Sequence, residues 1–443
     1  MESPNLSPAL PSEQLLDLAL KAGAKDAEVY QSRSLSRPVL FEANRLKRLE
    51  SSQSEGVALR LWKNGRPGLA VAYGAVNPQD LVDRAIAISA LNEPESVELT
   101  PGGHPEHYPD LGKSVAVEDL VVMGKEAIAK IRDANPEVLC TAELECEAET
   151  IRLINSQGLD CHYTDTTLNC FFSVEWVRGD DFLCVSDGQT QREQLNSDKV
   201  VKAIQQRLNW AQNNVYPPIG QVPILLTAKA ADLLWDTVQT ALNGKQVWEG
   251  ASPWSDRLGQ VVSSLNLSLS QHPNIGPYSC PFDDEGTPTR PLLLIREGQL
   301  QQFYCDRTIG RLLGVGSTGN GFRPSLGSYP TPGLVNIMVQ PGKGSLRDLL
   351  MQLDDGLVID QILGGGAGIS GDFSVNVDLG YRVCNGTIIG RVKDTMVAGN
   401  VYTALKQIIA LGEDAEWNGP CYTPSLVLEG LSVTASEQTS ILI

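Results

Sequence analysis

The chain has 443 residues, enough for about two or three domains, and its 42% hydrophobic and 20% charged residues are ordinary for a globular protein. Its net charge of -18, from 53 acidic and 35 basic residues, disfavours direct nucleic-acid binding, which needs a positive surface. No apolar run of about 18 residues occurs, so we expect no membrane-spanning helix. Residues 1–14 lack a basic segment followed by an apolar one, so we expect no secretory signal and a cytoplasmic location.

The nine cysteines and four histidines do not form a recognisable metal motif. No CxxC pair occurs, so the cysteines are predicted to be mostly buried free thiols. His104 and His107 have H-x-x-H spacing, but they lie in a segment rich in Pro and Gly rather than on a helix. Cys161 and His162 are adjacent in a strand pattern, so their side chains should point to opposite faces. We therefore expect no native transition-metal site in this chain.

The first half of the chain alternates predicted helices and hairpins. Residues 12–22 should form a helix, because Ser12 can cap it, apolar residues recur on one face and Gly23 can end it. The step Lys63-Asn64-Gly65-Arg66 predicts a hairpin turn, and Ser156-Gln157-Gly158 predicts a second. The predicted strands cover 27–32, 38–42, 56–62 and 68–73, and further helices cover 77–90, 115–133 and 189–213. A helix-plus-hairpin unit is therefore predicted to occur twice, with 94–115 as a linker or surface excursion.

The second half is predicted to be richer in strands. The Pro-containing step 216–220 predicts a boundary between an N-terminal domain, 1–218, and a C-terminal domain, 219–443. A strand over 222–226 and a helix over 228–242 are followed by short apolar runs separated by Gly, Pro, Asn and Asp. The predicted fold class is α+β, with an N-terminal helix-plus-hairpin domain and a β-rich C-terminal domain.

Two kinds of segment invite a ligand-binding interpretation. The acidic turn Asp283-Asp284-Glu285 has no alternating ligand spacing, so a solvated turn with Asp capping and Gly286 at positive φ is favoured over a cation site. The glycine-rich segments 314–321 and 364–368 lack the Lys-Ser/Thr ending of a P-loop, which favours tight turns and close backbone approach over phosphate binding.

The segment 364–400 carries the most distinctive pattern in the chain. It contains a glycine cluster, a Gly-Asp-Phe-Ser step over 371–374, and turns at 385–386 and 398–400. In these features it resembles the C-terminal signature of the TldD/PmbA family. Other parts of the chain resemble the same family in the same order, and they are residues 22–28, 54–56, 283–286 and 392–393. The resemblance therefore covers nearly the whole chain.

The resemblance implies where a zinc site should be, and the ligands are missing there. In the peptidase-bearing subunits of the family, a His-Glu-x-x-x-His helix and a downstream cysteine hold the metal. The corresponding positions here are Trp235, Asp236 and Thr240, and Cys421 lies roughly where the cysteine would come from. An indole has no lone pair to give, and a threonine hydroxyl is a poor zinc ligand. The resemblance thus implies the PmbA/TldE branch, with no metal in this chain and zinc in a partner.

The function implied by the resemblance is a non-catalytic subunit that pairs with a TldD-like subunit as a cytoplasmic zinc metallopeptidase. Peptides would enter a shared cavity, with strand addition along a glycine-rich edge as one way to hold them. The family carries an old label as modulators of DNA gyrase, and the acidic balance makes any such link indirect. The candidate cleft residues are Asp284, Glu285, Gly365, Asp372 and Phe373.

Two other functions remain open from the sequence. One is a stand-alone hydrolase that uses Asp283 and Glu285, or Ser370 and Asp372, although no histidine is near these residues in the sequence. The other is a homodimeric scaffold that binds peptides without cutting them. The sequence does not name the peptide.

Overall fold

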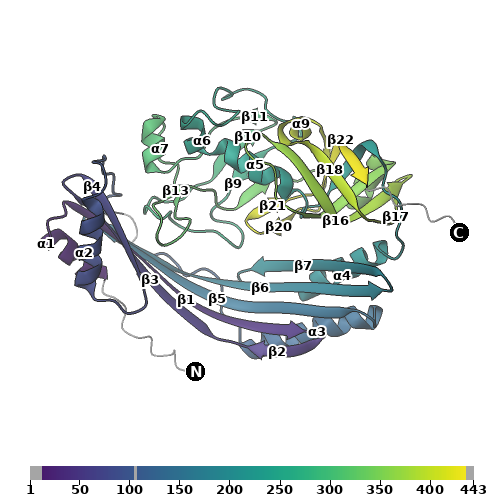
Figure 1. Ribbon diagram of the computed structural model, residues 1–443, viewed down its shortest axis with the longest axis horizontal. Coiled ribbons are helices and arrows are strands. Elements are labelled where there is room, and N and C mark those ends of the chain that lie inside the picture. Colours follow the sequence, from purple (N-terminus) through teal and green to yellow (C-terminus); the bar gives the residue numbers. More distant parts are fainter. Residues whose placement is uncertain (1–11, 104–106, 436–443) are drawn as a thin grey trace.

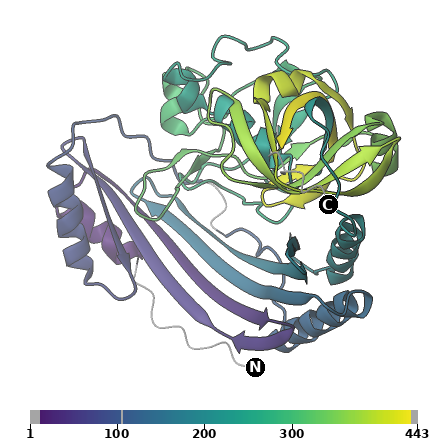
Figure 2. The same ribbon diagram turned by 45° about the vertical axis from the view of Figure 1, so that its right-hand side comes forward.

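A computed structural model describes residues 12–103 and 107–435, and its largest feature is a long, curved antiparallel sheet. The sheet has the strand order β4-β3-β1-β5-β6-β7, with the short β2 paired to β1. Figures 1 and 2 show this sheet passing beneath the C-terminal half of the chain. Its strands are β1 (Asp26–Glu42), β2 (Arg45–Leu49), β3 (Ser52–Lys63), β4 (Arg66–Tyr73), β5 (Leu139–Asn155), β6 (Asp160–Arg178) and β7 (Asp181–Gln191).

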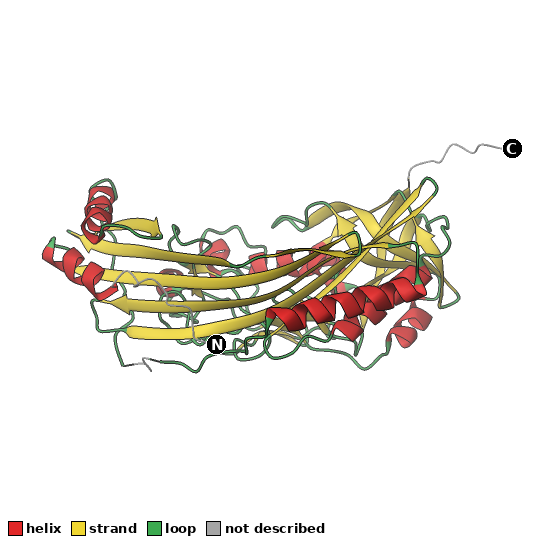
Figure 3. Ribbon diagram, turned by 90° about the horizontal axis from the view of Figure 1, so that it is seen from below, coloured by secondary structure: helices red, strands yellow, loops and turns green. Residues whose placement is uncertain are grey.

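Four helices pack on the apolar face of this sheet (Figure 3), and the last of them, beside the edge strand β7, also contacts the C-terminal half through Arg207, which donates to Asp360. Helices α1 (Ser12–Lys21) and α2 (Pro78–Ser89) pack at one end of the strands, and α3 (Val117–Ala134) and α4 (Ser197–Trp210) pack at the other. Alternate residues of each strand supply the apolar contacts, such as Val29 and Val39 on β1. The opposite, inner face of the sheet is therefore free to carry a different set of residues.

The C-terminal half contains two larger sheets and several short helices. In one sheet, β15 pairs with both β8 and β16, so that β15, β8, β22, β18 and β16 close into a ring. The other has the order β11-β10-β9-β14-β21-β20. The strands of the first sheet are β8 (Gly220–Leu226), β15 (Gly356–Leu363), β16 (Asp372–Cys384), β17 (Thr387–Val392), β18 (Thr395–Asn400), β19 (Ile408–Leu411) and β22 (Leu426–Ala435). Those of the second are β9 (Leu269–Gln271), β10 (Leu292–Arg296), β11 (Gln299–Leu300), β14 (Ile337–Val339), β20 (Glu416–Asn418) and β21 (Cys421–Thr423).

The remaining elements fill the space around these sheets. A small hairpin is formed by β12 (Gly321–Phe322) and β13 (Thr331–Pro332). The helices are α5 (Asp232–Leu242), α6 (Gly244–Trp248), α7 (Arg307–Leu312), α8 (Leu346–Leu353) and α9 (Val401–Lys406). Helices α5 and α9 share one large apolar core with residues of both sheets. None of the helices in the described part of the chain is long and apolar enough to cross a membrane.

Most of the predicted elements are confirmed, and the α+β class is confirmed with them. The first hairpin turns at Asn64 and Gly65, whose φ values of 55° and 73° suit a two-residue turn. The separate strands predicted over 27–32 and 38–42 form one continuous strand, β1, because β5 pairs along its length. The predicted helix over 189–213 is wrong at its beginning, since β7 continues to Gln191 and α4 starts at Ser197. The helix-and-strands unit does occur twice, and its copies meet where β1 pairs with β5.

Candidate functional site

Helix α5 carries the three positions where the zinc motif was expected. Trp235 is only 1% exposed, and its indole Nε1–H donates to the Thr423 hydroxyl at 2.9 Å. Asp236 and Thr240 are exposed, and the Thr240 hydroxyl donates to the Asp236 carbonyl oxygen at 2.9 Å, within the helix itself. Trp235 is therefore a core residue that joins α5 to β21, and no ligand set is formed by these side chains.

Cys421 lies on β21, the strand packed against α5. The thiol is 3% exposed, and its pKa is raised by burial and by the nearby carboxylates of Asp232 and Asp236. Burial and the charge of Asp236 also raise the pKa of Asp232 to about 7, while Asn418 donates a hydrogen bond to Asp232. A thiol with a raised pKa is a weak nucleophile and a weak metal ligand at neutral pH.

Across residues 12–103 and 107–435, no group of three or more His, Cys, Asp or Glu side chains is arranged to hold a metal ion. The H-x-x-H step begins at His104, which lies outside the described residues. His107 contacts His162 on β6, with 2.7 Å between Nδ1 and Nε2, so these two imidazoles form a pair.

The acidic turn is buried, and the prediction that it is solvated was wrong. Asp283 is fully buried and accepts hydrogen bonds from the backbone N–H groups of Glu285, Thr287 and Gly321 at 2.8–3.1 Å. The expected Asp capping and the positive φ of Gly286, 73°, are confirmed. The turn is buried because its Phe282 packs on the inner face of the long sheet.

Burial strongly affects the carboxyl groups of this turn. It raises the pKa of Asp284 to about 6 and that of Glu285 to about 7, and the pKa of Asp283 rises because of burial and the neighbouring Glu285. Asp284 accepts from the backbone N–H of Arg323, and Glu285 accepts from that of Arg307. Both candidate cleft residues are thus bound to the protein's own backbone, and their role in a cleft stays a prediction.

A buried ion network beside the turn joins the two halves of the chain. Glu28 on β1 pairs with Arg60 on β3 at 3.1 Å and with Arg323 of the C-terminal half at 2.8 Å. All three side chains are at most 10% exposed. The positions of the long sheet and the C-terminal half are therefore fixed by charge as well as by apolar packing.

The other candidate cleft residues lie next to α5. Gly365 is exposed in the loop before β16, Asp372 is exposed and accepts from the Asn400 side chain at 2.9 Å, and Phe373 is buried in the core that contains Trp235. The Thr237 hydroxyl of α5 donates to the Ala367 carbonyl oxygen at 3.0 Å. The structure thus brings the glycine-rich loop to the degenerate motif, whereas Asp284 and Glu285 contact the long sheet instead.

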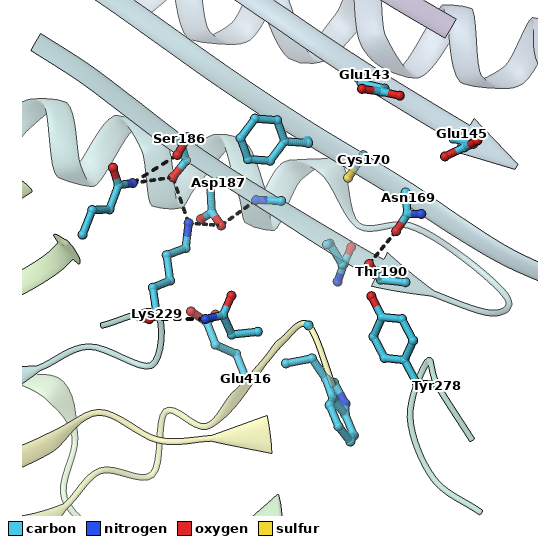
Figure 4. A pocket seen from close by; sticks show the side chains of 17 residues that line it. Glu143, Glu145, Asn169, Cys170, Ser186, Asp187, Thr190, Lys229, Tyr278 and Glu416 are labelled. Atoms are coloured by element: carbon cyan, nitrogen blue, oxygen red, sulfur yellow. Dashed lines mark hydrogen bonds and ion pairs between the residues drawn. The ribbon is translucent and has the colours of Figure 1, made fainter. Parts of the chain in front are cut away.

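A cavity of about 490 Å³ lies between the long sheet and the C-terminal half. Strands β5, β6 and β7 form one wall (Figure 4). The opposite wall comes from the loop before α5, the β20–β21 hairpin, Gln361 and Tyr278. The charged lining residues are Glu143, Glu145, Asp187, Lys229 and Glu416.

Lys229 holds the two walls of this cavity together. Its Nζ pairs with Asp187 at 2.7 Å and donates to the Ser186 carbonyl oxygen at 2.8 Å, as Figure 4 shows. Asp187 also pairs with the buried Arg207, at 2.9 Å. The single lysine of the lining is therefore neutralised by protein groups. Glu416 pairs with Lys199 at 3.4 Å, so Glu143 and Glu145 are the lining carboxylates that have no ion pair within the described residues.

The cavity residues were missed by the sequence reasoning, although part of the signal was present. Residues 143–149 alternate glutamate with Leu, Cys and Ala, which is the period-two pattern of a strand with one polar face. That pattern could have placed four glutamates on one face of β5. It could not have shown what lies opposite them, because the second wall comes from residues more than 80 positions away, such as Lys229.

Comparisons with known proteins agree with this architecture. The model of the PmbA/TldA metallopeptidase C-terminal domain matches residues 219–435, and that of domain 1 matches residues 27–89. An uncharacterized protein of Methanocaldococcus jannaschii is 25% identical over 94% of this chain and 98% of its own length. A metalloprotease TldD homolog of Buchnera aphidicola is 31% identical over 44% of this chain, but that alignment spans only 41% of the relative. The crystal structure of TldE from Thermococcus kodakarensis has the same fold, with a TM-score of 0.88 at 23% identity over 96% of this chain and 99% of that one.

Proposed function

The chain belongs to the PmbA/TldD metallopeptidase family, and we propose that within it this chain is the non-catalytic, PmbA/TldE-like subunit of a heteromeric peptidase. A TldD-like subunit would hold the zinc and cleave peptides in a cytoplasmic complex. This chain would complete the cavity in which the peptide lies. The observation that carries the proposal is the state of α5, where Trp235 and Thr240 stand at the positions of the two histidines.

The geometry of Trp235 supports this proposal physically. A catalytic zinc site needs about three converging protein ligands and an open position for water. Here the first position is filled by a buried indole that is hydrogen-bonded to Thr423, and the second by an exposed threonine whose hydroxyl is bonded within its own helix. Asp236 keeps a carboxylate, but a general base acts only on a water that something else activates.

The alternative of a stand-alone hydrolase finds less support. Every backbone N–H that Asp283 binds would have to be released before its carboxylate could act on a substrate. Asp372 is accessible, but it accepts a hydrogen bond from Asn400 rather than from an imidazole that could serve as a base. A homodimeric scaffold differs from the proposed heteromer in that it would bind peptides without the TldD-like subunit and would not cut them.

The test is to purify this chain without a tag, alone and together with a TldD-like subunit from the same organism. Zinc should be found only in the complex, and an unstructured peptide should be cleaved only by the complex, as measured by elemental analysis and mass spectrometry. Changing the motif glutamate of the partner to Gln should abolish cleavage, because it removes the general base. The matched variant of this chain, Asp236→Asn, should leave cleavage unchanged.

Three results would contradict the proposal. About one zinc per isolated chain would mean that the metal-ligand argument is wrong. Cleavage by this chain alone would favour the stand-alone hydrolase. A homodimer that binds peptides, ignores the TldD-like subunit and never cuts would favour the scaffold.

A further inference from the structure

Strand β4 is an edge strand of the long sheet, and it pairs only with β3. In an antiparallel pair, alternate residues bond to the neighbouring strand, and the residues between them point their backbone groups to the other side. Just after β4, the Gly74 N–H donates to the Glu55 carbonyl oxygen of β3 at 2.9 Å, so the even-numbered residues of β4 face β3. The odd-numbered Pro67 faces away, and its carbonyl oxygen accepts from the Asn92 side chain at 2.7 Å. The free side of β4 is thus formed by its odd-numbered residues.

Three successive odd-numbered residues, Leu69, Val71 and Tyr73, carry the backbone groups of this free edge. In the part of the chain that the structure describes, their N–H and C=O groups have no hydrogen-bond partner on that side. Residues 67–73 also contain no charged side chain. Soluble proteins usually protect such an edge with charges, because an unpaired edge accepts a further strand. The free edge of β4 is therefore suited to pairing with another chain.

The other edge strands of the long sheet are protected, which sets β4 apart. Strand β2 has the sequence RLKRL, and all of its residues are exposed, so its edge is charged. The free side of β7 is contacted by the C-terminal half, since the Ser186 carbonyl oxygen accepts from Lys229 at 2.8 Å and from Gln361 at 3.0 Å. Within residues 12–103 and 107–435, no comparable contact reaches the free side of 69–73.

Exposed apolar side chains lie on both faces of this edge. Helix α2 packs on one face of β4, and the chain leaves α2 at the free edge, where Asn92 contacts Pro67. Leu91, directly before Asn92, is 84% exposed, and Ile88 in the last turn of α2 is 38% exposed. By the alternation of a strand, Tyr73 lies on the opposite face, and it is 70% exposed. Apolar surface beside an unpaired strand is typical of a protein–protein interface.

We propose that β4 pairs with β4 of a second copy of this chain, antiparallel about a two-fold axis at Val71, so that the two long sheets join into one. In this register Leu69 faces Tyr73 of the second copy, and up to about six backbone hydrogen bonds form. An aliphatic residue opposite an aromatic one is a favourable cross-strand pair, and the two copies of α2 lie on the same face, across the axis from each other.

The edge itself favours a second copy as its occupant. It carries no charge that would select an acidic or a basic partner, and in this register it is complementary to itself, as a two-fold interface requires. The inference goes beyond the proposed function, because β4 lies at the end of the long sheet and α5 lies in the C-terminal half (Figure 1). A dimer through β4 therefore leaves the face of α5 available to a TldD-like subunit.

The test is analytical ultracentrifugation of the isolated full chain over a range of micromolar concentrations. At the higher concentrations the chain should sediment as a dimer, with twice the monomer mass of 47.9 kDa. Tyr73→Lys should raise the dissociation constant of the dimer at least about tenfold, because it places a charge against Leu69 of the second copy at two symmetric positions. The matched control is Tyr216→Lys, which changes a tyrosine of similar exposure, 75%, outside the long sheet and should leave the dissociation constant unchanged.

The backbone pairing has its own readouts. Val71→Pro removes an N–H that points to the free side and spares the hydrogen bonds to β3, as proline does on an edge strand. It should weaken the dimer at least about tenfold and leave the circular dichroism spectrum unchanged. In the unchanged protein, hydrogen exchange measured by mass spectrometry should become slower at residues 69–73 as the concentration rises, and stay the same at residues 45–49 of β2.

Three results would overturn the inference. They are a monomer at every concentration, a dimer that Tyr73→Lys leaves intact, and exchange at residues 69–73 that does not depend on concentration. A monomer whose association with the TldD-like subunit is weakened by Tyr73→Lys would also overturn it, and would assign the edge to that subunit. The dimer measurement needs neither zinc nor the TldD-like subunit, so its failure is distinct from the failure of the proposed heteromer.

Discussion

The buried ion network between the halves gives a sharp prediction about stability. Glu28 is 1% exposed, and its Oε1 accepts from both Arg60 and Arg323. The substitution Glu28→Gln keeps the shape of the side chain but removes the carboxylate with which both buried guanidinium groups pair. Breaking a buried pair in this way costs about 3–5 kcal/mol, because the remaining charge stays desolvated. We therefore expect a loss of stability far beyond that of a surface substitution.

The size of the effect can be expressed as a change in melting temperature. Unfolding entropy is about 2.1 cal/mol/K per residue, so 443 residues give about 0.9 kcal/mol/K and a decrease of about 3–5 °C. The matched control is Glu42→Gln, whose partner Lys47 is 66% exposed, and it should shift the melting temperature by less than about 1 °C. Calorimetry of the unchanged protein and of the two variants measures both shifts in melting temperature. A decrease for Glu28→Gln no larger than that of the control would refute the reasoning.

Two further predictions concern pH and the core. Burial raises the folded-state pKa of Glu285 from 4.5 to about 7. Between these pH values the folded protein binds more protons than the unfolded chain does. This group's contribution to the free energy of unfolding therefore falls as pH rises from about 4.5 to 7. Urea unfolding at pH 5 and pH 7.5 should show a smaller pH difference in Glu285→Gln, and an unchanged difference would contradict the pKa assignment. Trp235→Phe should cost about 1 kcal/mol through the lost hydrogen bond to Thr423, and Trp235→Ala about 3–5 kcal/mol through the cavity, both measured by urea unfolding. Losses below about 1 kcal/mol for the alanine variant would show that α5 is not held by this side chain.

Local features of the fold could be predicted from the sequence because they depend on neighbouring residues. The helix over 77–90 begins where Asn77 caps it, and the first hairpin turns where Asn64 and Gly65 accept positive φ. The continuity of β1 could not be predicted, because its middle residues are held by β5, more than 100 residues away. Likewise, the beginning of 189–213 has polar residues that suit a helix, but pairing with β6 extends β7 to Gln191.

The candidate site likewise has some features that the sequence predicts and others that depend on distant parts of the chain. Trp235 lies in the core, as is usual for an indole on an apolar helix face. The acidic turn was expected in solvent because three consecutive carboxylates are rarely buried. It is covered by the long sheet, and its carboxylates are satisfied by backbone N–H groups that the sequence does not reveal.

The inner face of the long sheet explains why the two halves do not pack against each other along its whole length. Near one end, the face is apolar, with Tyr30, Ile151 and Leu153 packed on the C-terminal half. Directly beyond Ile151, the same face of β5 changes to glutamate at every second residue through Glu143. Burying carboxylates that have no ion-pair partner against protein would cost several kcal/mol each, so we expect this stretch of the sheet to stay open to solvent. The sequence of β5 thus specifies both where the halves close on each other and where they must stay apart.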